Sequence, residues 1–333
     1  MVSFCYYINV LLIYARDAPN CMPQTSATQR PLVTYTALIT PFTKNGENGE
    51  IDIDALLNLA NLQAKAGIDG VVFAGTTGEG YSMGNCEYKQ AIRAIRAGFP
   101  RLNLIAGVSG LATSRFARQA RCAQEAGADQ VMIGMPSYCK PPQAGLEEHI
   151  VAVANHTDLP AIIYNVPTRT GVDLEPETTR RALARAKNII AIKEASPSMN
   201  RIEIYHNMGL TFLLGNDSGM QGGMVLGADG IVSVASNIVP AKVISIIRNS
   251  RVHPTQTLLE YNHVANLVDM LSCEVNPLPV KYAASLMGLC EPNYRLPLCP
   301  PTENSQRRIR TTLQSYSLVR TEPVGAVTFA MAK

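Results

Sequence analysis

The chain has 333 residues, of which 47% are apolar and 17% charged, a balance typical of globular proteins with ample material for a core. Its formal charge of +3 comes from scattered basic residues, which excludes the concentrated Lys/Arg face of a nucleic-acid-binding protein. The eight cysteines contain no C-x-x-C pair, so we expect reduced thiols and a cytoplasmic location instead of a disulfide framework.

The N-terminal segment, residues 1–30, is left out of the fold prediction. Its apolar run from Phe4 to Ala15 is too short to cross a bilayer, and no Lys or Arg precedes it, as a secretory signal would require. We interpret this segment as disordered or mis-extended, with a weak targeting segment as the alternative. No membrane association is expected.

One phrase recurs where a helix should give way to a strand. Ala66–Phe73 reads AGIDGVVF, and it is echoed by Ala126–Ile133 and by Leu226–Ser233. Each copy places a Gly where a helix should end, because only Gly enters the left-handed cap at little cost. The apolar run that follows is typical of a buried parallel strand. The phrase therefore marks a repeated αβ unit.

Eight short apolar strands are expected when the chain is read outward from these units. They cover about residues 32–39, 70–74, 102–107, 129–134, 160–165, 188–193, 211–215 and 229–234. Helix-period segments lie between them; in Thr113–Ala126, for example, Phe116, Ala120 and Ala123 share one face. This alternation predicts a TIM (β/α)8 barrel over residues 31–250.

An open, doubly wound sheet is the alternative fold. It would show a phosphate-binding G-x-G-x-x-G after its first strand, where this chain has Ile39-Thr-Pro-Phe. Beyond residue 250 the strand signal stops, and segments 254–272, 276–289 and 302–318 have helical patterns separated by prolines. We expect residues 251–320 to form a helical C-terminal extension packed on the barrel, and residues 321–333 to form a tail.

Catalytic groups in such a barrel lie just beyond the C-terminal ends of the strands. The sixth predicted strand ends in Lys193. A partly desolvated amine favours its neutral form, and a neutral amine can attack a ketone to form an imine. The competing interpretation is an ion pair between Lys193 and a barrel carboxylate.

Other strand ends supply hydroxyls and a cation. Tyr164 ends the fifth strand and could pass protons, and Arg169 in the following loop could hold a carboxylate. Thr76 and Thr77 lie between glycines after the second strand and could bind a small carboxylate. The alternatives are a core tyrosine, a solvated arginine and a simple tight turn. Tyr138 lies in a proline-rich loop after the fourth strand.

None of the five histidines falls at a predicted strand end, and neither a metal-binding pattern nor a P-loop is present. We therefore expect no metal and no cofactor. A lysine, two tyrosines, two threonines and an arginine together suit imine chemistry with proton transfer on small keto acids.

Three segments are similar to the signatures of the dihydrodipicolinate synthase/N-acetylneuraminate lyase family. They are Gly75–Glu79, Tyr164–Gly171 and Ile192–Ala195, and the resemblance runs from about Thr36 to Leu313, including Asn276-Pro-Leu-Pro-Val-Lys281. The resemblance implies condensation of pyruvate with L-aspartate 4-semialdehyde to 4-hydroxy-tetrahydrodipicolinate, a step of lysine and diaminopimelate biosynthesis. It also implies a homotetramer built as a dimer of dimers.

The same resemblance implies a role for each matching residue. Lys193 would form the imine with pyruvate, and Thr76 and Thr77 would hold its carboxylate. Thr77, Tyr164 and, from a neighbouring subunit, Tyr138 would relay protons. Arg169 would bind the carboxylate of the aldehyde. Two further residues would line the pocket: Gly215 and Val232.

Departures from the family pattern bear on regulation and substrate. Lysine-inhibited members bind lysine at a subunit interface, where this chain has Leu111, Arg115 and Ser137. Since Arg115 would repel the lysine ammonium, we expect a lysine-insensitive enzyme. The alternatives are an aldolase that cleaves a 2-keto-3-deoxy sugar acid or N-acetylneuraminate, which would not need Arg169, and a non-catalytic binding barrel.

Overall fold

The computed structural model describes residues 30–46 and 49–320. The predictions for residues 1–29 and for the 321–333 tail therefore lie outside the described residues. In the described part, no helix is both long and apolar enough to cross a membrane.

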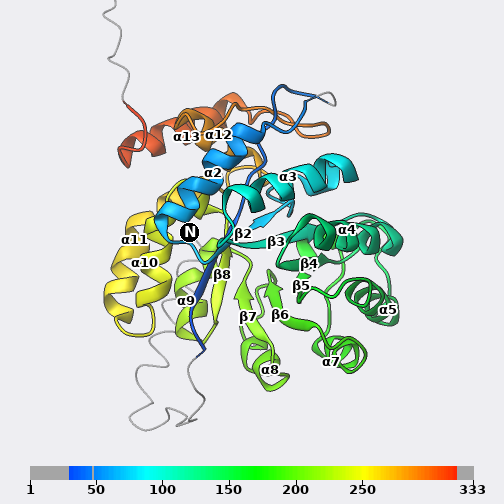
Figure 1. The fold of residues 1–333 in the computed structure, drawn as a ribbon. Coiled ribbons are helices and arrows are strands. Elements are labelled where there is room, and N and C mark those ends of the chain that lie inside the picture. The colour runs from blue at the N-terminus through cyan, green and yellow to red at the C-terminus, as the bar shows by residue number, and fades with distance from the viewer. Residues whose placement is uncertain (1–29, 47–48, 321–333) are drawn as a thin grey trace, which may run out of the picture. The chain divides into compact units, whose positions relative to one another are not determined.

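Eight parallel strands close into one barrel, as Figure 1 shows. β1 pairs with β8 through Val33 and Gly230 as well as with β2, which closes the sheet. The prediction of a TIM barrel is confirmed and the open sheet is wrong. Every strand overlaps its predicted range: β1 (Val33–Ala37), β2 (Gly70–Phe73), β3 (Asn103–Val108), β4 (Gln130–Gly134), β5 (Ala161–Asn165), β6 (Ile189–Glu194), β7 (Thr211–Leu214) and β8 (Gly230–Ser233).

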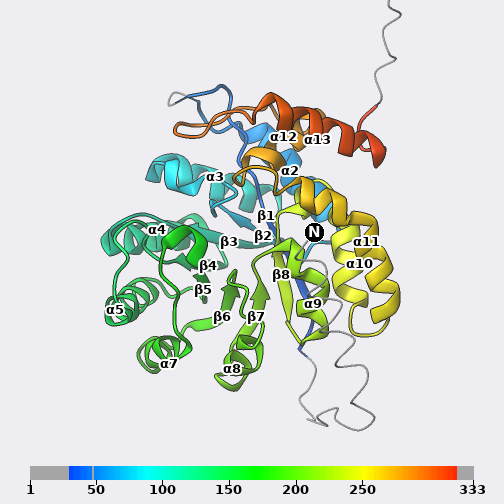
Figure 2. The same cartoon turned by 180° about the vertical axis from the view of Figure 1, so that it is seen from behind.

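Helices surround the strands on the outside of the barrel (Figures 1 and 2). The outer layer comprises α2 (Ile53–Ala66), α3 (Asn85–Gly98), α4 (Thr113–Ala126), α5 (Gln143–Ala154), α7 (Pro176–Arg185), α8 (Arg201–Asn207), α9 (Met220–Val225) and α10 (Pro240–Asn249). The repeated glycines Gly67, Gly127 and Gly227 have φ values of 79°, 94° and 103°. These left-handed conformations confirm the predicted role of the glycine in each αβ unit.

Side-chain alternation divides the apolar residues into two cores. Nine buried side chains fill the barrel interior: Tyr35, Ala37, Val72, Ile105, Met132, Ile162, Ala191, Leu213 and Val232. Residues between these positions point outward and pack under the helices. Tyr164 follows Ile162 by two residues and Lys193 follows Ala191 by two, so both side chains belong to the interior face at the carboxyl end of the barrel.

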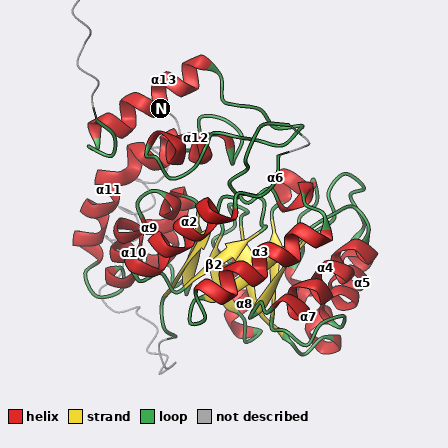
Figure 3. Ribbon diagram, turned by 45° about the horizontal axis from the view of Figure 1, so that its top comes forward, coloured by secondary structure: helices red, strands yellow, loops and turns green. Residues whose placement is uncertain are grey.

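The C-terminal region consists of α11 (Pro254–Met270), α12 (Leu278–Leu286) and α13 (Glu303–Ser315), which confirms the predicted helical extension. Figure 3 shows these helices beside the strand bundle. α12 packs on the short helix η3 (Ala235–Asn237), which directly follows β8. The extension therefore reaches the carboxyl end of the barrel, where catalytic groups are expected.

Candidate active site

Lys193 and Tyr164 are direct neighbours on adjacent strands. They are paired in the register of β5 and β6, and Lys193 Nζ lies 4.0 Å from the centroid of the Tyr164 ring. Lys193 is only 7% exposed. Among the described residues, no carboxylate lies within 4.0 Å of its ammonium, so the competing ion-pair interpretation finds no partner. The Lys193 ammonium therefore lies against the face of an aromatic ring and forms no ion pair with a carboxylate of the described residues.

Asp217 is the carboxylate associated with this lysine at longer range. It lies in η2 (Asp217–Gly219), just after β7, and its Oδ2 accepts hydrogen bonds from the backbone N–H groups of Val234 and Ala235, each at 2.9 Å. Burial raises the pKa of Asp217, and the charge of Lys193 opposes that rise. From the sequence, Gly215-Asn216-Asp217 at the end of the seventh strand could either cap the next helix or face the pocket.

A polar network behind the barrel wall fixes the ends of β5 and β6. Glu194 and Asn165 directly follow Lys193 and Tyr164, and Asn165 Nδ2 donates to Glu194 Oε1 at 2.9 Å. Arg201 Nη1 donates to Glu194 Oε2 at 3.2 Å. Because neighbouring side chains alternate across the sheet, these contacts anchor the strand ends from outside while the lysine and tyrosine face inward. The sequence patterns did not identify this network.

The turn after β2 is tightly closed on itself. Glu79 N donates to Thr76 O at 3.1 Å and Gly80 N donates to Gly75 O at 3.2 Å. A Cβ on Gly80 would lie 1.9 Å from Ala74 O, so only glycine fits there. The tight turn expected as an alternative is therefore present, and it presents Thr76 to a cavity while burying Thr77.

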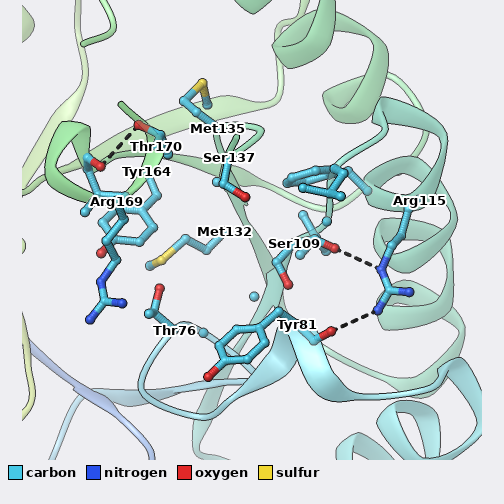
Figure 4. A pocket seen from close by; sticks show the side chains of 18 of the residues that line it. Thr76, Tyr81, Ser109, Arg115, Met132, Met135, Ser137, Tyr164, Arg169 and Thr170 are labelled. Atoms are coloured by element: carbon cyan, nitrogen blue, oxygen red, sulfur yellow. Dashed lines mark hydrogen bonds between the residues drawn. The ribbon is translucent and has the colours of Figure 1, made fainter. Parts of the chain in front are cut away.

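Thr76, Tyr164 and Arg169 line one cavity of about 630 Å³, shown in Figure 4. Arg169 belongs to α6 (Pro167–Thr170), the short helix after β5, and its Nη2 donates to the backbone O of Asn276 at 3.0 Å. Lys193 and Thr77 are not among the residues that line this cavity. Lys193 lies against Tyr164, which belongs to the neighbouring strand β5. The structure thus gathers three of the predicted residues at the cavity wall and places the lysine beside one of them.

Gly215 and Val232 both lie beside these residues. A Cβ on Gly215 would meet Ala195 Cβ at 2.7 Å and Glu194 O at 2.9 Å, so the strand ends can approach only because this residue is glycine. Val232 is buried in the barrel interior, in the same cluster as Tyr164.

Tyr138 does not join the other predicted residues within one chain. Its side chain is 89% exposed and its φ is +71°, a conformation that non-glycine residues rarely adopt. The loop that carries it connects β4 with α5, and its neighbour Ser137 does line the cavity.

The residues that depart from the lysine-binding pattern also line this cavity. Leu111, Arg115 and Ser137 all line it, together with Tyr81. Arg115 donates from Nε to Ser109 O at 3.3 Å and from Nη2 to Met83 O at 3.1 Å, and Figure 4 shows it reaching toward Ser109 and Tyr81. Burial raises the pKa of Tyr81 to about 12.

Within the part of the chain that the structure describes, no group of three or more His, Cys, Asp or Glu side chains is arranged to hold a metal ion. His149 is buried, and burial lowers its pKa to about 4. Its ring bonds to Gly134 O and Thr113 Oγ1, which makes it a structural histidine.

A closed parallel barrel with a buried lysine, a tyrosine and an arginine at its carboxyl end is the architecture of a (β/α)8-barrel enzyme. A family model described as the Dihydrodipicolinate synthetase family matches residues 31–316. The chain belongs to this family.

Individual relatives agree with the family model. A protein of Aquifex aeolicus named 4-hydroxy-tetrahydrodipicolinate synthase is 38% identical over 290 residues, which cover 86% of this chain and 97% of the relative. The crystal structure of dihydrodipicolinate synthase from Aquifex aeolicus matches with a TM-score of 0.83 at 35% identity, covering 87% of this chain and all of that one. The lysine-bound structure of the Cyanidioschyzon merolae enzyme matches with a TM-score of 0.81 at 28% identity, covering 86% of this chain and 99% of that one.

Proposed function

We propose that this chain condenses pyruvate with L-aspartate 4-semialdehyde to give 4-hydroxy-tetrahydrodipicolinate. The observation that carries the proposal is the buried Lys193 against Tyr164, next to a cavity that Arg169 and Thr76 line. The names of the relatives support the same reaction. The small-molecule substrates also fit a cavity of this size.

Each residue has one task in the proposed mechanism. Lys193 Nζ attacks the ketone carbon of pyruvate, and loss of water leaves an imine. Tyr164 and Thr77 carry the protons that this step and enamine formation require. The enamine carbon then attacks the aldehyde, whose carboxylate Arg169 binds through charge-assisted hydrogen bonds. The amine of the second substrate finally displaces Lys193 as the ring closes.

Tyr138 is proposed to complete the proton relay of a neighbouring subunit. Its exposure and its backbone conformation support this role, because a tyrosine held 89% exposed in a strained loop is available to a second chain. A homotetramer then needs a second contact surface. The exposed apolar residues Val225 in α9, Leu226 just after it and Leu259 in the neighbouring α11 support one.

The proposed enzyme is insensitive to lysine. Arg115 lines the cavity together with Leu111 and Ser137, and its charge would repel the ammonium of lysine. We expect millimolar lysine to leave the initial rate within about twofold of its uninhibited value. Strong inhibition by lysine would contradict this part of the proposal.

We further propose a cytoplasmic location, a barrel domain over residues 31–250 and an extension over residues 251–320. The scattered free thiols support the location, and the position of β8 before α11 supports the division.

Reductive trapping tests the central claim. Borohydride added with pyruvate should attach one pyruvate-derived mass to the chain, and peptide mapping should place it on Lys193. The Lys193→Met variant should remain folded and gain no mass. Turnover of pyruvate with aspartate semialdehyde, compared with cleavage of 2-keto-3-deoxy sugar acids and N-acetylneuraminate, then separates the synthase from the aldolase alternative.

A further inference from the structure

The loop between α11 and α12 brings Asn276 against the turn that follows β2. Asn276 Nδ2 donates to Thr77 Oγ1 at 2.9 Å, and the backbone O of Asn276 accepts from Arg169 Nη2 at 3.0 Å. These partners are 199 and 107 positions away in sequence. A single residue of the C-terminal extension therefore contacts both a proposed relay hydroxyl and the proposed carboxylate-binding cation.

The first hydrogen bond constrains the orientation of the Thr77 hydroxyl, because the Asn276 amide nitrogen donates to the hydroxyl oxygen. An amide nitrogen can only donate, so it occupies a lone pair of the hydroxyl oxygen and leaves the hydroxyl proton to point elsewhere. Across residues 30–46 and 49–320, no group accepts a hydrogen bond from this hydroxyl. The proton of this buried hydroxyl is thus kept for a partner that the folded chain does not itself supply.

The backbone of the turn is held by other contacts. Glu79 and Lys281 form a completely buried ion pair, which ties the end of the turn to α12. Glu79 N also donates to Thr76 O at 3.1 Å. These contacts do not involve the side chain of Asn276. The turn therefore does not depend on that side chain, which can orient the Thr77 hydroxyl separately.

We propose that Asn276 is a positioning residue for the reaction. Its side-chain amide directs the Thr77 proton toward the pyruvate imine, and its backbone carbonyl holds Arg169 at the aldehyde site. This inference rests on the proposed function. It assigns the C-terminal extension a direct effect on proton transfer, in addition to packing on the barrel.

The main test removes the side-chain amide of Asn276 and keeps its backbone carbonyl. Asn276→Ala should lower the rate of imine formation with pyruvate by about tenfold, since one oriented hydrogen bond is lost. The KM for aspartate semialdehyde should stay within about twofold, because the backbone O still accepts from Arg169. Val275→Ala changes an exposed neighbour in the same loop and should leave both quantities unchanged.

A second variant reverses the bond. Asn276→Asp has the same shape but replaces the amide donor with an acceptor oxygen, so the carboxylate should accept a hydrogen bond from the Thr77 hydroxyl and slow imine formation by about 10²-fold. This variant also keeps the test usable if the alanine variant does not fold. Thermal unfolding of each variant verifies the folded state.

A double-mutant cycle distinguishes orientation of Thr77 from general support of the fold. If Asn276 acts through Thr77, Asn276→Ala should have no further effect on imine formation in a Thr77→Val background. An equal loss in both backgrounds, or a parallel rise in the aldehyde KM, would overturn the inference. Failure of the unmutated chain to trap pyruvate would instead refute the proposed function.

Discussion

Arg169 is the residue that the proposed function assigns to the carboxylate of aspartate semialdehyde. Its guanidinium lies at the cavity wall and is oriented by the Asn276 carbonyl. Arg169→Ala should raise the KM for aspartate semialdehyde by roughly 10- to 100-fold, the loss expected for charge-assisted hydrogen bonds. Steady-state kinetics with varied aldehyde measures this change.

Pyruvate trapping provides the control for Arg169. The substitution should leave imine formation on Lys193 unaffected, because the first substrate binds without the guanidinium. An unchanged KM for the aldehyde would show that Arg169 does not bind this substrate, and it would favour the aldolase alternative.

His149 gives stability a defined dependence on pH. Its ring lies 3.1 Å from Gly134 O and 3.0 Å from Thr113 Oγ1, and burial lowers its pKa to about 4 from a usual value near 6.5. Since the unfolded chain takes up the proton first, the stability from the neutral ring is complete above about pH 6.5 and falls as the pH decreases toward 4. The loss should be about 2 kcal/mol by pH 5.

Urea unfolding at pH 7 and pH 5 measures this loss, with His149→Gln as the comparison. The glutamine variant starts from a lower free energy of unfolding but should lose less of it between the two pH values. Parallel losses in the two proteins would show that other groups cause the acid sensitivity.

At the level of elements, the strands could be predicted because each depends on local sequence. The glycine caps at Gly67, Gly127 and Gly227 and the apolar runs after them are short-range signals, and β2, β4 and β8 lie where they indicate. The strand-end rule for parallel barrels then brought Tyr164 and Lys193 together without knowledge of any contact.

The contacts from the C-terminal extension could not be predicted in the same way. Asn276 and Lys281 belong to a segment whose helical pattern predicts only its local structure, and their partners Thr77 and Glu79 lie about two hundred residues earlier. No periodicity in the sequence links such distant positions. The network of Asn165, Glu194 and Arg201 was missed for a related reason, because its residues face away from the site that the patterns define.

The Glu79–Lys281 pair couples two elements and predicts a large change in stability. Both side chains are completely buried, and Lys281 Nζ also donates to Asn293 O at 2.9 Å. Lys281→Met should therefore cost about 3–5 kcal/mol of unfolding free energy, because it leaves Glu79 buried without its cation.

The double variant Glu79→Gln with Lys281→Met tests that cause. It removes the unpaired carboxylate of Glu79 and should recover part of the lost free energy of unfolding, as measured by urea titration. No recovery would mean that lost packing, and not an unpaired carboxylate, is responsible.

At the level of the whole molecule, the exposed Tyr138 predicts that two defective chains can repair one another. Tyr138→Phe and Lys193→Met should each be inactive alone. When they are mixed under exchange conditions, a site with an intact lysine can receive the tyrosine of the other chain. Random pairing should restore about a quarter of the original activity.

Activity of the mixture is measured after exchange and compared with each variant incubated alone. Mixing Lys193→Met with a second lysine variant serves as the control, because that mixture contains no intact lysine. Absence of recovery despite exchange would place Tyr138 outside the neighbouring site.

The contact between Asn276 and Thr77 also sets an order of events during synthesis. A ribosome completes all eight strands by Ser233, yet the donor that turns the threonine proton follows more than forty residues later. All eight strands are therefore made before the group that orients the Thr77 hydroxyl, so this orientation is a late step in the synthesis of the chain.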